Sequence, residues 1–154
     1  MKKIEQGFSL IELLVVVAII GILAAVGTVG YGNYIKSTKV KALEANINSL
    51  ASALGTADKA VAAGITDVCS AGTATACITS ILTASPLENP YAPGGNIAQA
   101  ATCTAQGLFT LTPGTKKVTL KPCIPDTASG AAAGAAVEST TTAIDINLEA
   151  LTAS

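Results

Sequence analysis

The feature that most constrains this 154-residue chain is an uncharged segment between Glu12 and Lys36. It reads LLVVVAIIGILAAVGTVGYGNYI, from Leu13 to Ile35. An α-helix needs about 20 apolar residues to cross the hydrocarbon core of a bilayer, and this segment is longer than that. The first part of the segment is apolar on all sides, so a helix formed there has no polar face for water. The segment therefore predicts a helix that lies in a membrane or among other protein chains.

The composition of the chain argues against several functions. There is no His, the residue most often used as a general base and as a metal ligand. Nine Lys stand against ten acidic residues, which gives a net charge of −1 and no basic excess for nucleic acid. A small basic cluster, Lys116, Lys117 and Lys121, is interpreted as a solvated surface, with DNA contact as the weaker alternative. Without a nucleophile–base pattern, the sequence predicts no enzyme, no cofactor and no metal site.

The N-terminus has the general character of an export signal but departs from the secretory pattern. The polar start MKKIEQG is followed directly by the apolar segment. A secretory peptidase would cut after that segment, near Ala24 and Ala25. Against such a cut, Glu12 lies at the start of the apolar segment, and the helical pattern continues beyond the cut. The small residue Gly7 stands before the segment, where a different peptidase could act.

The stretch GFSLIELLVVVAIIGILAA, from Gly7 to Ala25, closely resembles the processing and assembly motif of type IV pilins and related pseudopilins. The resemblance implies that residues 1–7 are a leader, which the prepilin peptidase removes by cutting between Gly7 and Phe8. It also implies that Phe8 becomes the N-methylated first residue and that Glu12 is the glutamate that directs assembly. Close resemblance covers residues 1 to about 35, and beyond them only the architecture is similar.

Physical chemistry supports the assembly role of Glu12. A carboxylate well inside a bilayer costs about 2.5–3.5 kcal/mol, so a compensating partner is needed. Cleavage after Gly7 creates a cationic amine on Phe8, about one helical turn from Glu12. The amine of one subunit can then neutralise Glu12 of a neighbour and set the axial register, as a lone buried polar group does in coiled coils. Before processing, the alternative is that Glu12 lies at the headgroup interface close to Lys2 and Lys3.

The predicted helix contains a potential weak point at GTVGYG, which holds Gly27, Gly30 and Gly32. Each interior Gly costs a helix about 1 kcal/mol relative to Ala. We expect this segment to unwind or extend when a subunit leaves the bilayer. The alternative is close helix packing through small residues. Many type IV pilins have Pro in this region, whereas this sequence has Val29.

After Lys36 the apolar residues form a stripe instead of covering all sides. Their spacing by three and four predicts an amphipathic helix, and Gly64 is a plausible C-terminal stop. One helix is thus expected from about Ser9 to Ala63, with residues 8–35 as membrane anchor and filament core and residues 36–64 as the amphipathic part. The stripe consists of Val40, Leu43, Ile47, Leu50, Leu54, Ala57 and Val61.

Residues 65–154 are predicted to form a small globular head of loops and short strands. The expected fold is α+β, with a three- or four-stranded antiparallel sheet packed on the helix stripe and the apolar half of the helix protruding. This is the arrangement of the pilin family that the N-terminus resembles. The predicted features are a turn region at Ser85–Gly95, a hairpin of Leu108–Thr112 and Lys117–Lys121 with its turn at PGT, an exposed loop at Thr127–Ala136 and a strand within Ala143–Leu151.

Four cysteines lie in the head: Cys69, Cys77, Cys103 and Cys123. An even number in a small domain with few aromatic residues indicates two disulfides in an oxidising compartment. Three pairings are possible. We prefer Cys69–Cys77 with Cys103–Cys123, because the second pair brackets the predicted hairpin. Zinc sites need Cys pairs at shorter spacing. The disulfides place the head outside the cytoplasm.

These observations predict the precursor of a major type IV pilin, a subunit that forms a helical homo-oligomer for adhesion, twitching motility or DNA uptake. The subunit is expected in the inner membrane before assembly and in an extracellular pilus afterwards. By resemblance its partners are the prepilin peptidase/N-methylase, an inner-membrane platform protein and an assembly ATPase. Two alternatives are a type II secretion pseudopilin and a single-pass membrane protein with a small extracytoplasmic binding domain that does not assemble.

Overall fold

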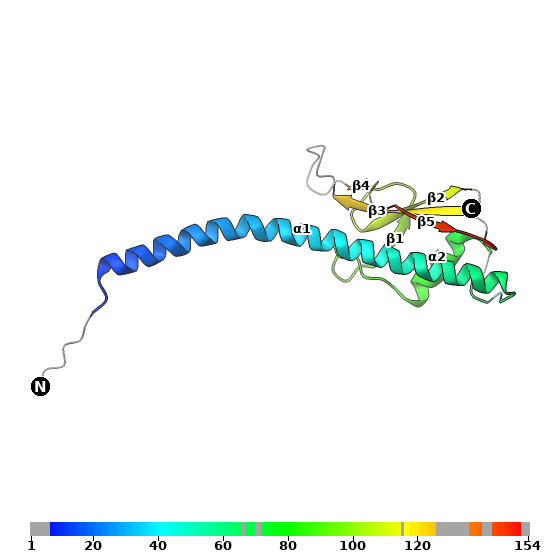
Figure 1. The fold of residues 1–154 in the computed structure, drawn as a ribbon, viewed down its shortest axis with the longest axis horizontal. Helices are drawn as coiled ribbons and strands as arrows, with labels where there is room; N and C mark the ends of the chain where they lie inside the picture. Colours follow the sequence, from blue (N-terminus) through cyan, green and yellow to red (C-terminus); the bar gives the residue numbers. More distant parts are fainter. Residues whose placement is uncertain are drawn as a thin grey trace, which may run out of the picture. The chain divides into compact units, whose positions relative to one another are not determined.

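The computed structural model describes residues 7–65, 67–69, 72–114, 116–125, 136–139 and 143–151. The chain divides into two compact units, Met1–Thr38 and Lys39–Ser154. The longest element begins in the first unit and ends in the second. The elements, labelled in Figure 1, are α1 (Leu10–Ala62), α2 (Ala74–Ala84), β1 (Ala98–Ala100), β2 (Leu108–Gly114), β3 (Lys117–Pro125), β4 (Ala136–Glu138) and β5 (Ile144–Asn147).

The C-terminal part of α1 confirms the predicted amphipathic helix. The central residues of the stripe are buried, among them Leu43, Ile47 and Leu54. The helix ends at Ala62, and Gly64 follows with a φ of 89°. The Gly64 N–H donates to the Val61 carbonyl at 2.9 Å, and the Ile65 N–H to the Ala60 carbonyl at 3.0 Å. This pair of bonds is the Schellman motif, in which glycine readily takes the left-handed conformation.

Helix α2 corrects the prediction that the segment after Gly64 contains only loops and strands. Thr73 caps its start, because the Thr73 side chain accepts a hydrogen bond from the Ala76 N–H at 3.2 Å. Ala74, Cys77 and Ile78 are buried, which is the spacing of one helix face. The Ala, Thr and Ser content of the segment concealed this short amphipathic pattern.

The sheet has five strands and is mostly antiparallel, instead of the three or four antiparallel strands predicted. β1 pairs with β2 in parallel, whereas β2–β3, β3–β4 and β3–β5 are antiparallel. The hairpin of β2 and β3 is confirmed, but its strands are longer than predicted. Gly114 pairs with Lys117, so the chain reverses after PG and not at PGT, and Lys116 has a φ of 57°.

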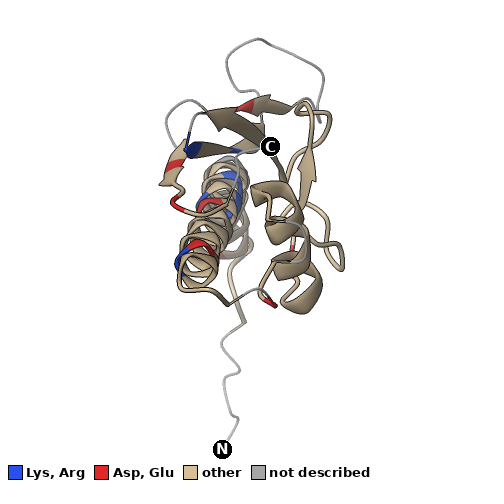
Figure 2. Ribbon diagram, turned by 90° about the vertical axis from the view of Figure 1, so that its right-hand side faces the viewer, with Lys and Arg blue, Asp and Glu red and all other residues tan. Residues whose placement is uncertain are grey.

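The core of the second unit lies between the sheet and the two helices (Figure 2). Phe109, Val118 and Leu120 of the hairpin are fully buried together with the α1 stripe. The predicted C-terminal strand is β5, from which Ile146 points into the core, as does Leu148 just after it. The predicted loop at Thr127–Ala136 falls outside the described residues, except for Ala136, which begins β4. The α+β class is thereby confirmed.

Candidate processing and assembly site

The predicted cleavage site, Gly7–Phe8, lies immediately before the helix. Gly7, Phe8 and Ser9 have no regular secondary structure, and α1 begins at Leu10. Gly7 is exposed, and the Phe8 side chain is 82% exposed. Proteases cut exposed segments that are not tied into secondary structure. The bond between Gly7 and Phe8 therefore has the local structure that a peptidase needs.

Glu12 has a role at the helix start that the sequence analysis missed. Its carboxylate accepts a hydrogen bond from the Ser9 N–H at 2.9 Å, and the Ser9 carbonyl accepts one from the Leu13 N–H at 3.3 Å. A Glu three residues after a Ser is the sequence signal of a capping box, and Ser9 and Glu12 have that spacing. A carboxylate in the first turn also stabilises the positive end of the helix dipole. Glu12 thus satisfies a backbone donor that the helix leaves free.

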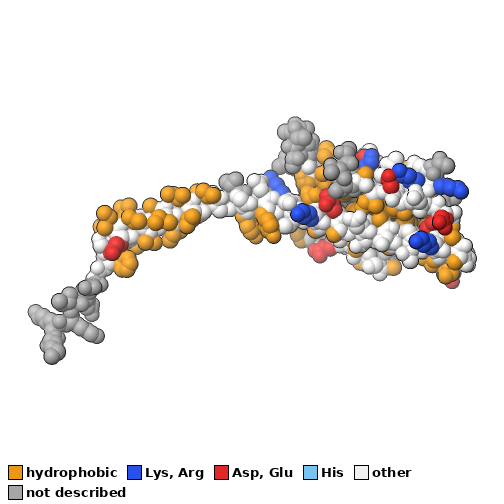
Figure 3. Space-filling model, in the orientation of Figure 1, with side chains coloured by type: hydrophobic (Ala, Val, Ile, Leu, Met, Phe, Trp, Pro, Cys, Tyr) orange, Lys and Arg blue, Asp and Glu red, His pale blue; other side chains and the backbone are white. Residues whose placement is uncertain are grey.

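The first unit exposes an unusually large apolar surface. Hydrophobic side chains cover the N-terminal part of α1 (Figure 3). Soluble monomers rarely expose continuous apolar patches of more than a few hundred Å². By length and composition α1 could cross a membrane, and no part of its apolar window is buried. The side chains concerned include Leu10, Ile11, Leu13, Leu14, Val15, Val16, Val17, Ile19, Ile20, Ile22, Leu23 and Val26.

The three glycines of the predicted weak point lie inside α1, which is continuous through them. A side chain added at Gly27, Gly30 or Gly32 would meet no atom within 4 Å. The Thr28 hydroxyl donates to the Ala25 carbonyl at 3.0 Å, a local bond from a side chain to the backbone of the helix. Unwinding of this segment on assembly stays a prediction.

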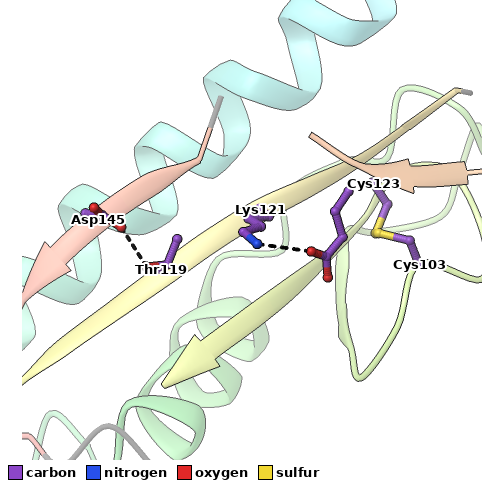
Figure 4. Close-up of polar contacts among 6 residues, drawn as sticks. Cys103, Thr119, Lys121, Cys123 and Asp145 are labelled. Carbon is purple, nitrogen blue, oxygen red and sulfur yellow. Dashed lines mark hydrogen bonds and ion pairs between the residues drawn. A yellow bond between two sulfur atoms is a disulfide. The ribbon is translucent and has the colours of Figure 1, made fainter. Parts of the chain in front are cut away.

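Both disulfides of the structure join cysteines of the head. They are Cys69–Cys77 and Cys103–Cys123, which are also the two pairs preferred from the sequence. Cys123 lies on β3 and is fully buried, so its bridge fastens the loop before β2 to the sheet (Figure 4). The other bridge fastens the segment after α1 to the first turn of α2.

The basic cluster on the hairpin is largely paired with acidic residues. The Lys121 ammonium lies 3.2 Å from Glu138, and the Lys117 ammonium lies 2.6 Å from Asp145. The Thr119 hydroxyl also donates to Asp145 (Figure 4). Hydrogen bonds from Lys117 and Thr119 lower the pKa of Asp145. Two of the three clustered lysines therefore have partners within the head, which weakens the DNA alternative.

Asp58 is a second position that the sequence analysis missed. It lies on the same face of α1 as the apolar stripe, four residues after Leu54, and is 2% exposed. Its carboxylate accepts three hydrogen bonds from the successive backbone N–H groups of residues 149–151, at 2.7, 3.0 and 2.7 Å. Burial acts to raise the pKa of Asp58, but the three N–H donors outweigh burial and hold the pKa below its usual value. An acid on the buried face of a helix was the signal available in the sequence.

Comparisons with known proteins match part of the chain. Residues 2–28 match the family model of the prokaryotic N-terminal methylation motif. A type IV major fimbrial protein FimA of Dichelobacter nodosus is 45% identical over 56 residues, 36% of this chain and 36% of that protein. A FimA of Dichelobacter nodosus strain VCS1703A is 58% identical over 40 residues, 26% and 25% of the two chains. The fimbrial protein EcpC of Eikenella corrodens is 45% identical over 40 residues, 26% of each chain.

The chain spans about a third or less of the length of these curated relatives. No solved structure matches it significantly. The family-model match includes the predicted cleavage site, Glu12 and the apolar segment of α1 as far as residue 28. The N-terminal segment of this chain carries the prokaryotic N-terminal methylation motif and is homologous to that of type IV major fimbrial proteins.

Proposed function

We propose that the chain is the precursor of a major pilin, the structural subunit of a type IV pilus. The observation that carries the proposal is the order of features at the N-terminus. An exposed Gly7–Phe8 bond directly precedes a helix whose apolar side chains are exposed over several turns, with Glu12 in the first turn. The type IV fimbrial relatives support this assignment over the secretion pseudopilin and the membrane protein that does not assemble.

We propose a separate role for each successive segment of the chain. Residues 1–7 are a leader that the prepilin peptidase removes, after which Phe8 is N-methylated. Residues 8–35 anchor the subunit in the inner membrane and later form the filament core. Residues 36–64 are the amphipathic part of the same helix and pack against the head. The head, residues 65–154, lies outside the cytoplasm and on the surface of the extracellular pilus.

On assembly the apolar helix leaves the lipid and packs against identical helices of neighbouring subunits. Lipid tails are as apolar as the side chains, so the hydrophobic effect contributes little to this step, and close packing and polar pairing decide it. We propose that the Phe8 amine of one subunit pairs with Glu12 of the next, which neutralises the carboxylate and fixes the axial register. An inner-membrane platform protein and an assembly ATPase are the expected partners.

The proposal is tested by producing the chain in a type IV piliated bacterium that lacks its own major pilin. Mass spectrometry of sheared surface material should find a polymer whose subunits begin at methylated Phe8. A Gly7→Val variant should remain uncut in the membrane fraction. Glu12→Ala should reduce filament yield strongly, whereas the matched control Glu88→Ala, an exposed acid of the head, should assemble normally.

Two outcomes would contradict the proposal. One is an extracellular polymer whose subunits begin at Met1. The other is a wild-type chain that stays uncut and unassembled in the membrane while the peptidase processes a control pilin in the same cells. Normal filaments from Glu12→Ala would refute the register role alone.

A further inference from the structure

Two exposed tyrosines lie on one side of the first unit. The side chains of Tyr31 and Tyr34 are 68% and 65% exposed, and residues three apart are neighbours on a helix surface. A tyrosine side chain combines an apolar ring with a polar hydroxyl. It is therefore enriched at the boundary between hydrocarbon and headgroups. The tyrosines end the apolar surface, and exposed Lys36 follows two residues after Tyr34.

The spacing between these tyrosines and Glu12 corresponds to the thickness of a bilayer core. Tyr31 and Tyr34 lie 19 and 22 residues after Glu12 on a continuous helix. At a rise of about 1.5 Å per residue these separations are about 29 and 33 Å. A typical tilt of about 20° shortens them to about 27 and 31 Å. The hydrocarbon core is about 30 Å thick, so Glu12 and the tyrosine pair reach opposite boundaries of it.

We propose that Tyr31, Tyr34 and Lys36 form an interfacial anchor that binds the outer headgroup layer of the membrane and sets the depth of the unassembled subunit. The proposal rests on the proposed function, because it requires this part of α1 to span the inner membrane. The phenol hydroxyls reach the polar layer while the rings stay near the acyl chains. The Lys36 ammonium, just beyond them, attracts anionic phospholipid headgroups.

This anchor determines where Glu12 lies before assembly. With the tyrosines at the outer boundary, the Glu12 carboxylate lies at the inner headgroup boundary, where its bond from the Ser9 N–H adds to contact with water. An outward shift by one turn, about 5 Å, would carry the carboxylate into hydrocarbon. An inward shift by one turn would draw both phenol hydroxyls into the acyl chains. The two ends of the segment therefore resist displacement in opposite directions.

The depth can be measured with a single tryptophan, because the chain contains none. The full chain is inserted into vesicles of phosphatidylcholine and phosphatidylglycerol that carry bromine at shallow or deep acyl positions. Tryptophan fluorescence of Tyr34→Trp should be quenched more by shallow bromines. The matched control Leu23→Trp, halfway between Glu12 and Tyr34, should be quenched more by deep ones. Deeper or equal quenching of Tyr34→Trp would overturn the proposal.

A second measurement tests whether the tyrosines set the depth. In the Leu23→Trp background, replacing Tyr31 and Tyr34 by Ala should move the tryptophan by about 5 Å, one helical turn. The control pair Val15→Ala and Val26→Ala, both exposed apolar positions within the span, should leave its depth unchanged. If the tryptophan keeps its depth when both tyrosines are replaced, the anchor proposal is refuted but the proposed function is not. If neither bromine position quenches Leu23→Trp, the helix is not in the bilayer and the proposed function fails with it.

Discussion

Replacing Asp58 should remove a large part of the stability of the head. Its carboxylate is the only charged side chain that is buried among the described residues, and it holds the segment after β5 against α1. The three N–H donors come from Glu149, Ala150 and Leu151, which are 91 to 93 positions away along the chain. Loss of the carboxylate leaves all three donors without this acceptor.

The expected magnitude follows from the burial of each donor. A hydrogen bond to a charged group contributes about 1.5–3 kcal/mol, and a buried donor left unpaired costs about 1–3 kcal/mol. Glu149 is exposed and Ala150 half-buried, so water can replace their bonds in part, whereas the bond from Leu151 is buried. We therefore expect Asp58→Ala to lower the free energy of unfolding by about 2–4 kcal/mol, out of a typical total of about 5–15 kcal/mol.

The same carboxylate makes stability depend on pH. Because the pKa of Asp58 is lower in the folded state, its contribution is fully present above the unfolded pKa, near 3.8. The contribution is lost as the pH falls through the folded pKa. Asp58→Asn keeps the shape but cannot ionise, so its stability should decline less than that of the wild type below about pH 4.

Urea unfolding in detergent, with the disulfides intact and followed by circular dichroism, measures both effects. The midpoint should fall without a change of slope. Asp67→Asn, an exposed acid of the same unit, is the matched control and should stay within about 0.5 kcal/mol of wild type. Two results would refute the role assigned to Asp58. One is a loss of unfolding free energy below about 1 kcal/mol for Asp58→Ala. The other is a stability of Asp58→Asn that falls with decreasing pH as steeply as that of the wild type.

Two further perturbations test the packing of the head by thermal unfolding. Gly107 has a φ of 81°, and a Cβ added there would overlap the side-chain amide of buried Asn89. Gly107→Ala should therefore cost about 2–4 kcal/mol, whereas Gly55→Ala, at an open helix position, should gain about 0.5–1 kcal/mol. If Gly107→Ala unfolded at the same temperature as the wild type, the close approach of Asn89 to Gly107 would not be needed for stability. Removing the Cys103–Cys123 bridge, which closes a longer loop, should cost about 3 kcal/mol, against about 2.5 kcal/mol for Cys69–Cys77. The reverse order of the two losses would contradict the loop-entropy argument.

The long helix was the most predictable part of the fold. Its stripe repeats over six turns, and Gly64 marks its end, so local chemistry and tertiary packing agree. The β2–β3 hairpin followed from alternation, but its turn was displaced because Gly114 pairs with Lys117 and belongs to the ladder. Helix α2 was missed because Ala and Thr give little hydrophobic contrast. β1 spans only three residues and depends on its neighbour β2.

Some residues of the candidate site could also be singled out from the sequence, and others could not. A short motif beside the helix was enough to predict a cleavage site after Gly7 and an assembly role for Glu12, and both stay predictions. Asp58 could not be assigned a role from the sequence, since its three donors are distant in the chain and are brought to it only by folding. For Tyr31 and Tyr34 the structure adds that both side chains are exposed on a continuous helix, which fixes their distance from Glu12.

If the chain is exported as proposed, the link between Asp58 and residues 149–151 has a consequence for that step. During such export the apolar stripe of α1 would leave the translocation channel well before Ile146, Leu148 and Leu151, which cover it in the folded head. In that interval the stripe faces water and other emerging chains, the situation in which incomplete domains aggregate. On the proposed function, each newly exported subunit would need shielding until its last core residues have crossed, and this late closure would limit how fast assembly-competent subunits accumulate.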